Sequence, residues 1–241
     1  MNPFTLDGQT VAITGASGGI GSAAARIAVT LGAKVILTDL SAPNELAVEL
    51  SAEGASARAN ALDVSDRKAV QAWVHDCEPI DALIDCAAIC PFDDWESEDW
   101  ELTRDQVFGI NLGGPINLCR ALMPEMARRG GGRIALVGSI AGRIGGVKSS
   151  PHYLMSKGGV HSFVRWAAKR GAENNVLVNA IAPGVVDTPM TENQSFDYSG
   201  FPLGRKATAD EIAGPLVFLI TPAAGYVTGA VLDVNSAMHF S

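Results

Sequence analysis

Three side chains in the middle of the chain have the types and spacing needed to move a proton. Tyr153 and Lys157 stand four residues apart, so on a helix they project from one side, about 40° apart. A fixed ammonium beside a phenol favours the phenolate and lowers a tyrosine pKa from about 10 towards neutral pH. Ser139 ends an apolar run, 133–139, that predicts a buried strand, and its hydroxyl could reach the same substrate oxygen. Because Tyr-x-x-x-Lys also occurs on ordinary helices, this proton-transfer interpretation depends on the rest of the chain.

A glycine-rich turn follows the first predicted strand and precedes a helix. The β-branched segment 10–14 predicts the strand, and the alanine-rich segment 22–31 predicts the helix. The turn between them contains Gly15, Ser17, Gly18, Gly19, Ile20 and Gly21. Glycines there let the backbone approach a pyrophosphate, which the N–H groups at the start of the helix would bind. Glycines also form plain turns, but the flanking strand and helix favour a dinucleotide-binding site.

The second predicted strand, 34–39, ends in an acidic residue. Asp39 stands 20 residues beyond Gly19, where a carboxylate can accept hydrogen bonds from the adenosine ribose and repel a 2′-phosphate. Leu40 and Ser41 supply no arginine to bind that phosphate, so the expected cofactor is NAD rather than NADP. The alternative is a surface aspartate at a strand end.

Strands and helices alternate along the whole chain without a linker or a repeat. Further strands are predicted at 57–62, 80–85, 133–139, 176–181 and 230–234, and helices at 45–53, 66–77, 103–118, 121–129, 153–171 and 209–220. This order predicts an α/β fold with one doubly wound, mostly parallel, seven-stranded sheet and helices on both faces. The length of 241 residues and the hydrophobic content of 47% suit one such domain.

Ligands bind doubly wound sheets at the carboxyl ends of the strands. Five predicted strands are followed there by candidate residues, namely Gly15, Asp39, Ala87, Ser139 and Pro183. Cys86, Ala87 and Ala88 turn out of the fourth strand at the level of the expected cofactor. After the third strand, Asp63 either binds the adenine amino group or only begins the next turn, with Val64 beside it.

The long predicted helix that contains Asn111 has a proline in its path. Pro115 should kink this helix, and Asn111 is then either satisfied by nearby backbone or positioned for a polar role. Before the helix, segment 93–101 is acidic and contains two tryptophans. We interpret this segment as the solvated start of a helix.

Charge and composition argue against several classes of partner. The net charge of −8 disfavours nucleic acid, whose phosphates are bound by clustered lysine and arginine. No apolar run is long enough to span a bilayer, and the first eight residues lack the features of a signal peptide. The four cysteines form no Cys-x-x-Cys pair and have no histidine at ligand spacing, so we expect a reducing, cytoplasmic location and no bound metal.

Taken together, these motifs make the chain resemble the classical short-chain dehydrogenase/reductase family over nearly its whole length. The resemblance rests on the cofactor loop 14–21, on a catalytic tetrad in the family's order and spacing, and on its nicotinamide-side loop. The tetrad is Asn111, Ser139, Tyr153 and Lys157, and the loop is marked by Pro183, Gly184 and Thr188. Segments 202–205 and 227–229 resemble the family's C-terminal signatures. Two segments depart from the pattern: Asp85-Cys86-Ala87-Ala88 replaces the usual Asn-Asn-Ala-Gly, and 235–237 replaces the usual Asp-Gly-Gly.

The resemblance implies a single-domain Rossmann fold over residues 1–241 and an oxidoreductase that interconverts a secondary alcohol and a ketone with a nicotinamide cofactor. Tyr153 would be the general acid/base, Lys157 would lower its pKa and bind the nicotinamide ribose, and Ser139 would polarise the substrate oxygen. Asn111 would bend its helix and help to hold a water in a proton relay to Lys157. Beyond the glycine loop and Asp39, the implied cofactor contacts are Leu40, Asp63, Val64, Cys86, Ala87, Ala88, Tyr153, Lys157, Pro183, Gly184, Val186 and Thr188.

The substrate pocket is expected between segments 142–147 and 188–201. The residues expected to contact the substrate are Ser139, Arg143, Tyr153 and Gly184. Arg143, Lys148 and His152 either attract a substrate carboxylate or are solvated loop cations. The aromatic residues Phe196, Tyr198 and Phe201 either line the pocket or pin the loop.

Two other functions stay open at this point. A 3-oxoacyl thioester (acyl carrier protein) reductase resembles the same pattern but usually takes NADPH, which Asp39 opposes. A non-catalytic nucleotide-binding scaffold would generally lack the tyrosine or the lysine of the motif. By analogy with the family we also expect a homotetramer or homodimer. Val160, Phe163, Val164 and Ala167 would then lie either at the subunit interface or in the core.

Overall fold

The computed structural model describes residues 2–146 and 148–241. Its described part contains one sheet of seven strands in the order β3-β2-β1-β4-β5-β6-β7. The strands are β1 (Thr10–Thr14), β2 (Lys34–Asp39), β3 (Ala57–Ala61), β4 (Ala82–Asp85), β5 (Gly132–Val137), β6 (Val176–Pro183) and β7 (Val231–Val234). All six strand pairs are parallel. The predicted doubly wound sheet is confirmed, and it is wholly parallel.

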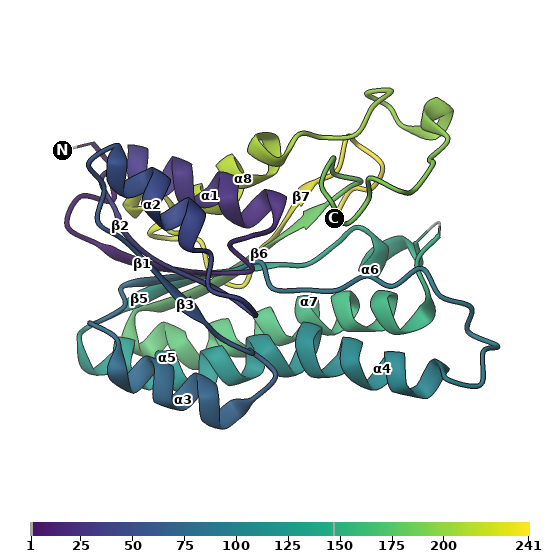
Figure 1. Ribbon diagram of the computed structural model, residues 1–241. Helices are drawn as coiled ribbons and strands as arrows, with labels where there is room; N and C mark the ends of the chain where they lie inside the picture. The colour runs from purple at the N-terminus through teal and green to yellow at the C-terminus, as the bar shows by residue number, and fades with distance from the viewer. Residues whose placement is uncertain (1, 147) are drawn as a thin grey trace.

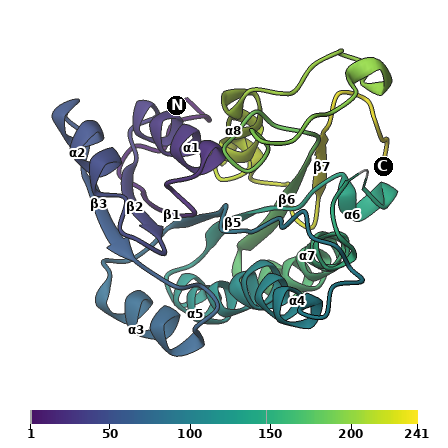
Figure 2. The ribbon, with the colours of Figure 1, turned by 45° about the vertical axis from the view of Figure 1, so that its right-hand side comes forward.

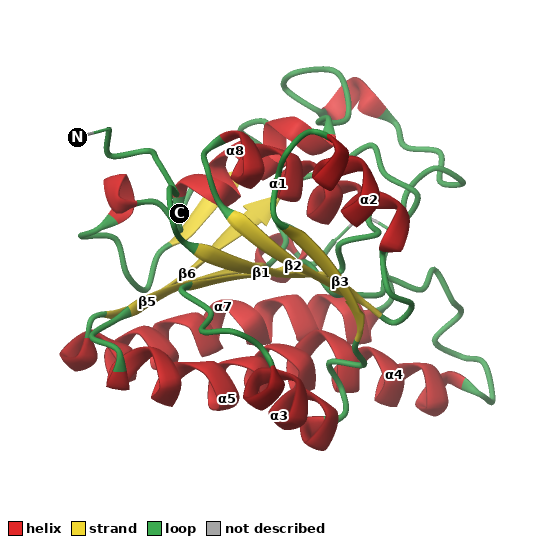
Figure 3. Cartoon of the chain, turned by 60° about the vertical axis from the view of Figure 1, so that its left-hand side comes forward, coloured by secondary structure: helices red, strands yellow, loops and turns green. Residues whose placement is uncertain are grey.

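Helices cover both faces of the sheet, as expected for a parallel sheet that is buried on both sides. The helices are α1 (Gly19–Thr30), α2 (Asn44–Ala52), α3 (Arg67–Asp76), α4 (Trp100–Phe108), α5 (Gly114–Arg128), α6 (Ala141–Ile144), α7 (Pro151–Gly171) and α8 (Ala209–Phe218). One layer holds α1, α2 and α8, and the other holds α3, α4, α5 and α7 (Figures 1 and 3). No helix of residues 2–146 and 148–241 is long and apolar enough to cross a membrane.

Two apolar clusters hold the layers together, one on each face of the sheet. Along β1, Val11 and Ile13 pack into the cluster under α1 and α8, whereas Ala12 packs into the cluster above α5 and α7. This alternation follows the two-residue period of a strand. Strand β6 lies between the two clusters, and all of its residues are buried. The two clusters thus hold a frame in which the loops that follow the strands meet at the carboxyl edge of the sheet.

Helix starts differ in how their free N–H groups are satisfied. Helix α8 begins with a capping box in which Thr208 and Glu211 bond each other's backbone N–H groups. The Asp66 carboxylate accepts hydrogen bonds from the backbone of Lys68 and Ala69 at the start of α3. In contrast, Gly18 precedes α1 without any side-chain hydrogen bond. The first turn of α1 therefore keeps N–H groups that can bind an anion.

The predicted long helix through Asn111 is interrupted earlier than expected. Helix α4 ends at Phe108, a π-helical turn occupies Gly109–Gly113, and α5 begins at Gly114. Pro115 lies at the start of α5, where it cannot donate a backbone hydrogen bond to the π-turn before it. The interruption is a π-turn centred on Asn111, with the proline directly after it, rather than a proline kink within one helix.

Candidate active site

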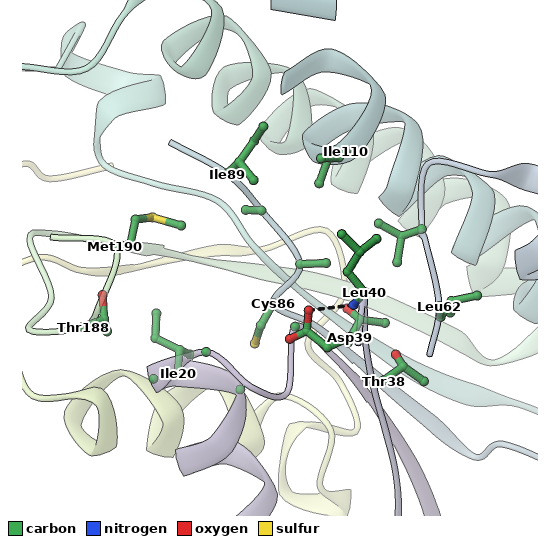
Figure 4. A pocket seen from close by; sticks show the side chains of 18 of the residues that line it. Ile20, Thr38, Asp39, Leu40, Leu62, Cys86, Ile89, Ile110, Thr188 and Met190 are labelled. Atoms are coloured by element: carbon green, nitrogen blue, oxygen red, sulfur yellow. Dashed lines mark hydrogen bonds between the residues drawn. The ribbon is translucent and has the colours of Figure 1, made fainter. Parts of the chain in front are cut away.

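A cleft opens at the carboxyl edge of the sheet, where the loops after β1, β2 and β4 meet. Its cavity has a volume of about 300 Å³ (Figure 4). The predicted cofactor residues that line it are Gly15, Gly18, Gly19, Ile20, Gly21, Asp39, Leu40, Asp63, Val64, Cys86, Ala87, Ala88 and Thr188. The structure thus brings together most of the residues that the sequence assigned to a cofactor.

Two positions of the glycine loop require glycine for steric reasons. Gly15 has φ of 62°, and a Cβ there would lie 2.7 Å from the backbone of Cys86 and Ala87. A Cβ on Gly21 would overlap the carbonyl oxygen of Gly15. The loop can therefore fold tightly against the start of α1 and leave its uncapped N–H groups at the cavity wall. A pyrophosphate fits this wall, because backbone N–H groups and the helix dipole both favour an anion.

Asp39 stands at the other end of this cleft, at the carboxyl end of β2. Its Oδ2 accepts a hydrogen bond from the backbone N–H of Ser17 at 3.0 Å. Its Oδ1 accepts one from the backbone N–H of Leu40 at 2.8 Å (Figure 4). Ser17 does not line the cavity itself, and its N–H instead orients the carboxylate. Asp63 begins the turn before α3, because its carboxylate accepts hydrogen bonds from the N–H and hydroxyl of Ser65. It also lines the cavity, and its binding of the adenine amino group stays a prediction.

A second cavity, of about 150 Å³, adjoins the first. The two cavities share lining residues, namely Ile20, Cys86, Ala88, Thr188 and Met190. The second cavity is also lined by the predicted site residues Ser139, Tyr153, Lys157, Pro183, Gly184 and Val186. Residues that carry a proton-transfer motif therefore face a chamber continuous with the glycine-lined cleft.

The tyrosine and the lysine are arranged on one face of α7, as their spacing predicts. The ammonium of Lys157 lies 5.7 Å from the centre of the Tyr153 ring. It also donates a hydrogen bond to the carbonyl oxygen of Val137, the last residue of β5, at 2.8 Å. Lys157 is buried, so its position is fixed by strand and helix together.

The expected lowering of the Tyr153 pKa by Lys157 is not found in this structure. Burial of the hydroxyl raises the pKa of Tyr153 well above its usual value, the thiol of Cys90 raises it further, and the hydrogen bond with Ser139 lowers it. The reason is geometric: the lysine ammonium is directed to the Val137 carbonyl and sits over the ring. Burial likewise lowers the pKa of Lys157, and the Asp85 carboxylate opposes that shift.

Ser139 lies two residues beyond the end of β5 rather than within the strand. Its hydroxyl accepts a hydrogen bond from the backbone N–H of Ala141 at 3.1 Å. Its own backbone N–H donates to Nε2 of the buried His161 at 3.3 Å. Burial first, and then the charge of Arg143, lower the pKa of His161 to about 4, so this ring is neutral at pH 7. His161 therefore fixes the loop that presents Ser139.

Asn111 is buried one layer behind the cavities and lines neither of them. Its Nδ2 donates to the carbonyl oxygen of Ile89 at 2.9 Å and to Oγ of Ser156 at 3.1 Å. Its Oδ1 accepts from the N–H of Ile89 at 3.0 Å. The side chain thus ties the loop after β4 to α7, which contains Tyr153.

The structure corrects the expected substrate contact of Arg143. Its Nε lies 3.1 Å from Oδ1 of Asp233 on β7, and its guanidinium donates to the carbonyl oxygen of Val231 at 2.9 Å. Arg143 does not line the second cavity. Asp233, close to the C-terminal end of the chain, pairs with its guanidinium, so Arg143 joins α6 to β7 instead of meeting a substrate.

The acidic segment before α4 is not merely solvated. Asp93 lies 3.0 Å from Nε2 of His152, a fully buried residue beside Tyr153. The ring of Trp100 stacks on His152 at 5.4 Å, and its Nε1 donates to Oγ of Ser150 at 3.1 Å. These contacts fasten the segment to the start of α7. His152 is therefore a structural partner of Asp93 rather than a loop cation.

Asp85, which departs from the family pattern, retains a link between β1 and β4. Its Oδ1 accepts hydrogen bonds from Oγ1 of Thr14 at 2.5 Å and from the N–H of Ala87 at 3.3 Å. Burial raises the pKa of Asp85, while the Thr14 hydrogen bond and the charge of Lys157 lower it. The carboxylate therefore stands close enough to Lys157 for their charges to interact.

Several cavity residues were not anticipated from the sequence. The second cavity is also lined by Cys90, Phe92 and Met238, which no prediction named, and by Ile144 and Met190 of the two expected pocket-wall segments. Met238 follows the C-terminal segment 235–237, and Figure 2 shows the C-terminus beside α6. Of the loop aromatics, Phe196 lines the cavity, whereas Tyr198 and Phe201 form an edge-to-face pair with a separation of 5.4 Å. Val147, expected in the pocket wall, lies outside the described residues.

The doubly wound parallel sheet, the glycine-lined cleft and the adjoining chamber define an NAD(P)-binding α/β oxidoreductase. The family model for short chain dehydrogenases matches residues 9–199, and the chain belongs to that family.

Relatives within the family act on different substrates. The chain is 37% identical to a galactitol 2-dehydrogenase (L-tagatose-forming) from Cereibacter sphaeroides, over 96% of this chain and 95% of that one. It is 34% identical to the 3-oxoacyl-acyl-carrier-protein reductase FabG of Thermotoga maritima, over 97% and 98%. A crystal structure of a candidate NAD(P)-dependent gluconate 5-dehydrogenase from Beutenbergia cavernae, with NADP at low occupancy, superposes with a TM-score of 0.92. That protein is 32% identical, with 98% and 99% of the chains covered.

Proposed function

We propose that this chain is an NAD-dependent dehydrogenase that interconverts a secondary alcohol and a ketone. The observation that carries the proposal is the position of Ser139, Tyr153 and Lys157 on one chamber that joins the glycine-lined cleft. A bound nicotinamide dinucleotide would supply the hydride acceptor or donor in that cleft. The chain's own residues would bind the alcohol and move its proton.

Tyr153 is the proposed general acid/base. In alcohol oxidation its phenolate takes the hydroxyl proton, and in ketone reduction its phenol returns one. Ser139, held by His161 and Ala141, donates a hydrogen bond to the same substrate oxygen. Because burial raises the pKa of Tyr153, the phenolate is scarce at neutral pH. Alcohol oxidation should therefore become faster as the pH rises, and ketone reduction should become slower.

Asn111 and Lys157 have positioning roles in this proposal. Lys157 supplies a buried positive charge beside the phenol and would bind the ribose next to the nicotinamide. Asn111 keeps the loop after β4 in register with α7 through Ile89 and Ser156. The water relay through Asn111 stays a prediction, which is supported by its position between these two elements.

Preference for NAD over NADP rests on Asp39. Its carboxylate is held at the cleft by two backbone N–H groups, at 2.8 and 3.0 Å. A 2′-phosphate at this end of the cleft would meet that negative charge directly. The NADP found with the Beutenbergia protein makes the preference a question for measurement on this chain.

A homotetramer or homodimer is part of the proposal, and of the two alternatives for Val160, Phe163, Val164 and Ala167 the core is the one observed. Val160, Val164 and Ala167 are buried in the core of the subunit, and Phe163 packs against them. The exposed apolar residues on α4 and α7 are Leu102, Met155 and Trp166. These side chains are the better candidates for a subunit contact. Sedimentation of the protein as a monomer at micromolar concentration would contradict the proposed dimer or tetramer.

A cytoplasmic location is also proposed. The four cysteines are all free in this structure, which supports a reducing compartment.

Reduction of a 3-oxoacyl thioester is the second candidate function. It is favoured by the similarity to the Thermotoga reductase, which extends over nearly the whole length of both chains. The two functions differ in the expected cofactor, because Asp39 opposes the 2′-phosphate of NADPH. A preference for NADPH with an acyl thioester would move this candidate to the front.

The test is a turnover assay with the full chain. The protein is mixed with NAD or NADP and a panel of secondary alcohols, alditols and hydroxy acids, and the absorbance of the reduced nicotinamide is followed. Oxidation of one class with NAD is the expected result. Cofactor binding without turnover on any class would contradict the proposal and favour a non-catalytic scaffold.

A further inference from the structure

The chamber that contains Tyr153 is lined by two ammonium groups and by no carboxylate among the residues that the structure describes. The two groups belong to Lys157, which has a role in the proposed reaction, and to Lys148. We infer that the substrate is an acid, and that Lys148 binds its carboxylate while Ser139 and Tyr153 bind the carbinol. This inference rests on the proposed dehydrogenase function and names its substrate class.

Lys148 is positioned at the chamber mouth. Its ammonium donates hydrogen bonds to the carbonyl oxygen and, at 3.4 Å, the hydroxyl of Ser195. It also lies 5.4 Å from the centre of the Phe196 ring, which lines the same chamber. A lysine ammonium has three donors, so one remains for a ligand after these contacts.

The other basic side chains near the chamber are already paired with acids. Arg143 pairs with Asp233 at 3.1 Å, and His152 pairs with Asp93 at 3.0 Å. Lys148 has no carboxylate within 4.0 Å in the described part of the chain. Its charge is therefore the one that remains available to an anion entering the chamber.

The lining and the volume of the chamber both suit an acid with a short carbon chain. The whole chain has a net charge of −8, which repels anions at long range, so recognition of an acid needs a local cation. Many other lining residues of the chamber are apolar, including Phe92, Ile144 and Met190, and they would contact the carbon chain of an acid whose carboxylate meets Lys148 at the exposed mouth. The chamber volume of about 150 Å³ suits a short acid rather than a long acyl chain.

The substrate class is therefore a hydroxy acid and its keto acid, sugar acids included. The carbinol carbon loses a hydride, with its electron pair, to the oxidised nicotinamide, and the hydroxyl proton goes to Tyr153. The C–H and O–H bonds break, the C=O double bond forms, and the carboxylate is unchanged.

The experiment compares hydroxy acids of three to six carbons with their primary amides, which have a similar shape and no charge. The ratio kcat/KM with NAD is measured for the wild type, Lys148→Gln, Lys148→Arg and Lys169→Gln. Lys169 is an exposed lysine on α7 that lines neither the cleft nor the chamber, and its variant controls for loss of a surface charge. We expect the wild type and Lys148→Arg to prefer the acid by about tenfold, and Lys148→Gln to lose that preference through KM.

An amide used as well as its acid by the wild type would overturn the inference. Equal losses for acid and amide in Lys148→Gln would overturn it too, because they would indicate a structural role. If no compound is turned over, the proposed function fails, and calorimetric titration with the same acids and amides decides the inference separately. Acid binding that disappears in Lys148→Gln but not in Lys169→Gln would support a carboxylate site at Lys148. Equal binding of acids and amides would overturn the inference.

Discussion

Replacing Thr14 with valine removes the strongest hydrogen bond to the buried Asp85 without changing the size of the side chain. Both residues are almost inaccessible to solvent, and Oγ1 of Thr14 lies 2.5 Å from Oδ1 of Asp85. The remaining donor to this oxygen is the N–H of Ala87 at 3.3 Å. A hydrogen bond to a charged group contributes about 1.5–3 kcal/mol, so we expect Thr14→Val to lose about 2 kcal/mol of unfolding free energy at pH 8. For a chain of this size the melting temperature would fall by about 4–8 °C.

The loss should depend on pH, with a sign that follows from the pKa of Asp85. Burial raises this pKa in the folded state above its unfolded value, so the stability of the wild type falls as the pH rises above that unfolded value. The Thr14 hydrogen bond lowers the pKa of Asp85 in the folded state, so this pKa is higher in Thr14→Val. The unfolding free energy of the variant therefore falls more steeply with rising pH than that of the wild type. Below the folded pKa, where Asp85 is protonated, the variant loses only a neutral hydrogen bond, which contributes about 1 kcal/mol.

Urea unfolding at pH 5 and pH 8 measures the effect, and the chain offers a matched control. Thr38 is the partner of Thr14 in the β1–β2 register and is equally buried, but its Oγ1 donates only to the neutral carbonyl oxygen of Ile13, at 3.5 Å. Thr38→Val should lose less than about 1 kcal/mol, and equally at both pH values. Equal losses of unfolding free energy for the two variants, or a loss for Thr14→Val that is the same at both pH values, would contradict this prediction.

Three further substitutions test individual residues of the site. Asp39→Ala should raise the ratio of kcat/KM with NADP to that with NAD by about tenfold or more, and an unchanged steady-state ratio would remove the assigned role of Asp39. His152→Phe keeps the stacking on Trp100 but loses the contact with Asp93. The segment before α4 should then be held less firmly, and KM should rise several-fold. Unaltered kinetics would show that the His152–Asp93 contact is dispensable. Arg143→Met leaves the carboxylate of Asp233 without its partner and should lower the free energy of unfolding by about 3 kcal/mol in urea titrations. A selective rise in KM for acids, with stability unchanged, would return Arg143 to the substrate site.

The sequence predicted the sheet well because strands buried on both faces have a local signal. Strands β1 and β2 have the predicted bounds, since short β-branched runs end at a glycine turn or an acidic residue. The candidate residues at the strand ends were brought together for the same reason, because parallel strands present their carboxyl ends at one edge. Asp39 and Ser139 could both be placed in this way before any contact was known, whereas Tyr153 was placed by its helical spacing from Lys157.

Contacts between distant residues were the part that sequence reasoning missed. Asp233, the partner of Arg143, lies far along the chain from it. Because the local sequence does not show this partner, Arg143 was assigned to the substrate. The acidic segment before α4 seemed solvated because its partner His152 lies on α7. The second cavity includes Met238 because the C-terminal segment returns to α6, and nothing in the local sequence indicates that return.

The central claim is that Tyr153 transfers the substrate proton in an NAD-linked oxidation. The most direct measurement is kcat with NAD for Tyr153→Phe, alongside NADH affinity from fluorescence and the control Tyr198→Phe, whose ring pairs with Phe201 outside the chamber. We expect Tyr153→Phe to lower kcat by about 10²-fold or more and to leave NADH affinity within a few-fold, and we expect Tyr198→Phe to stay active. A kcat for Tyr153→Phe close to that of the wild type would contradict it.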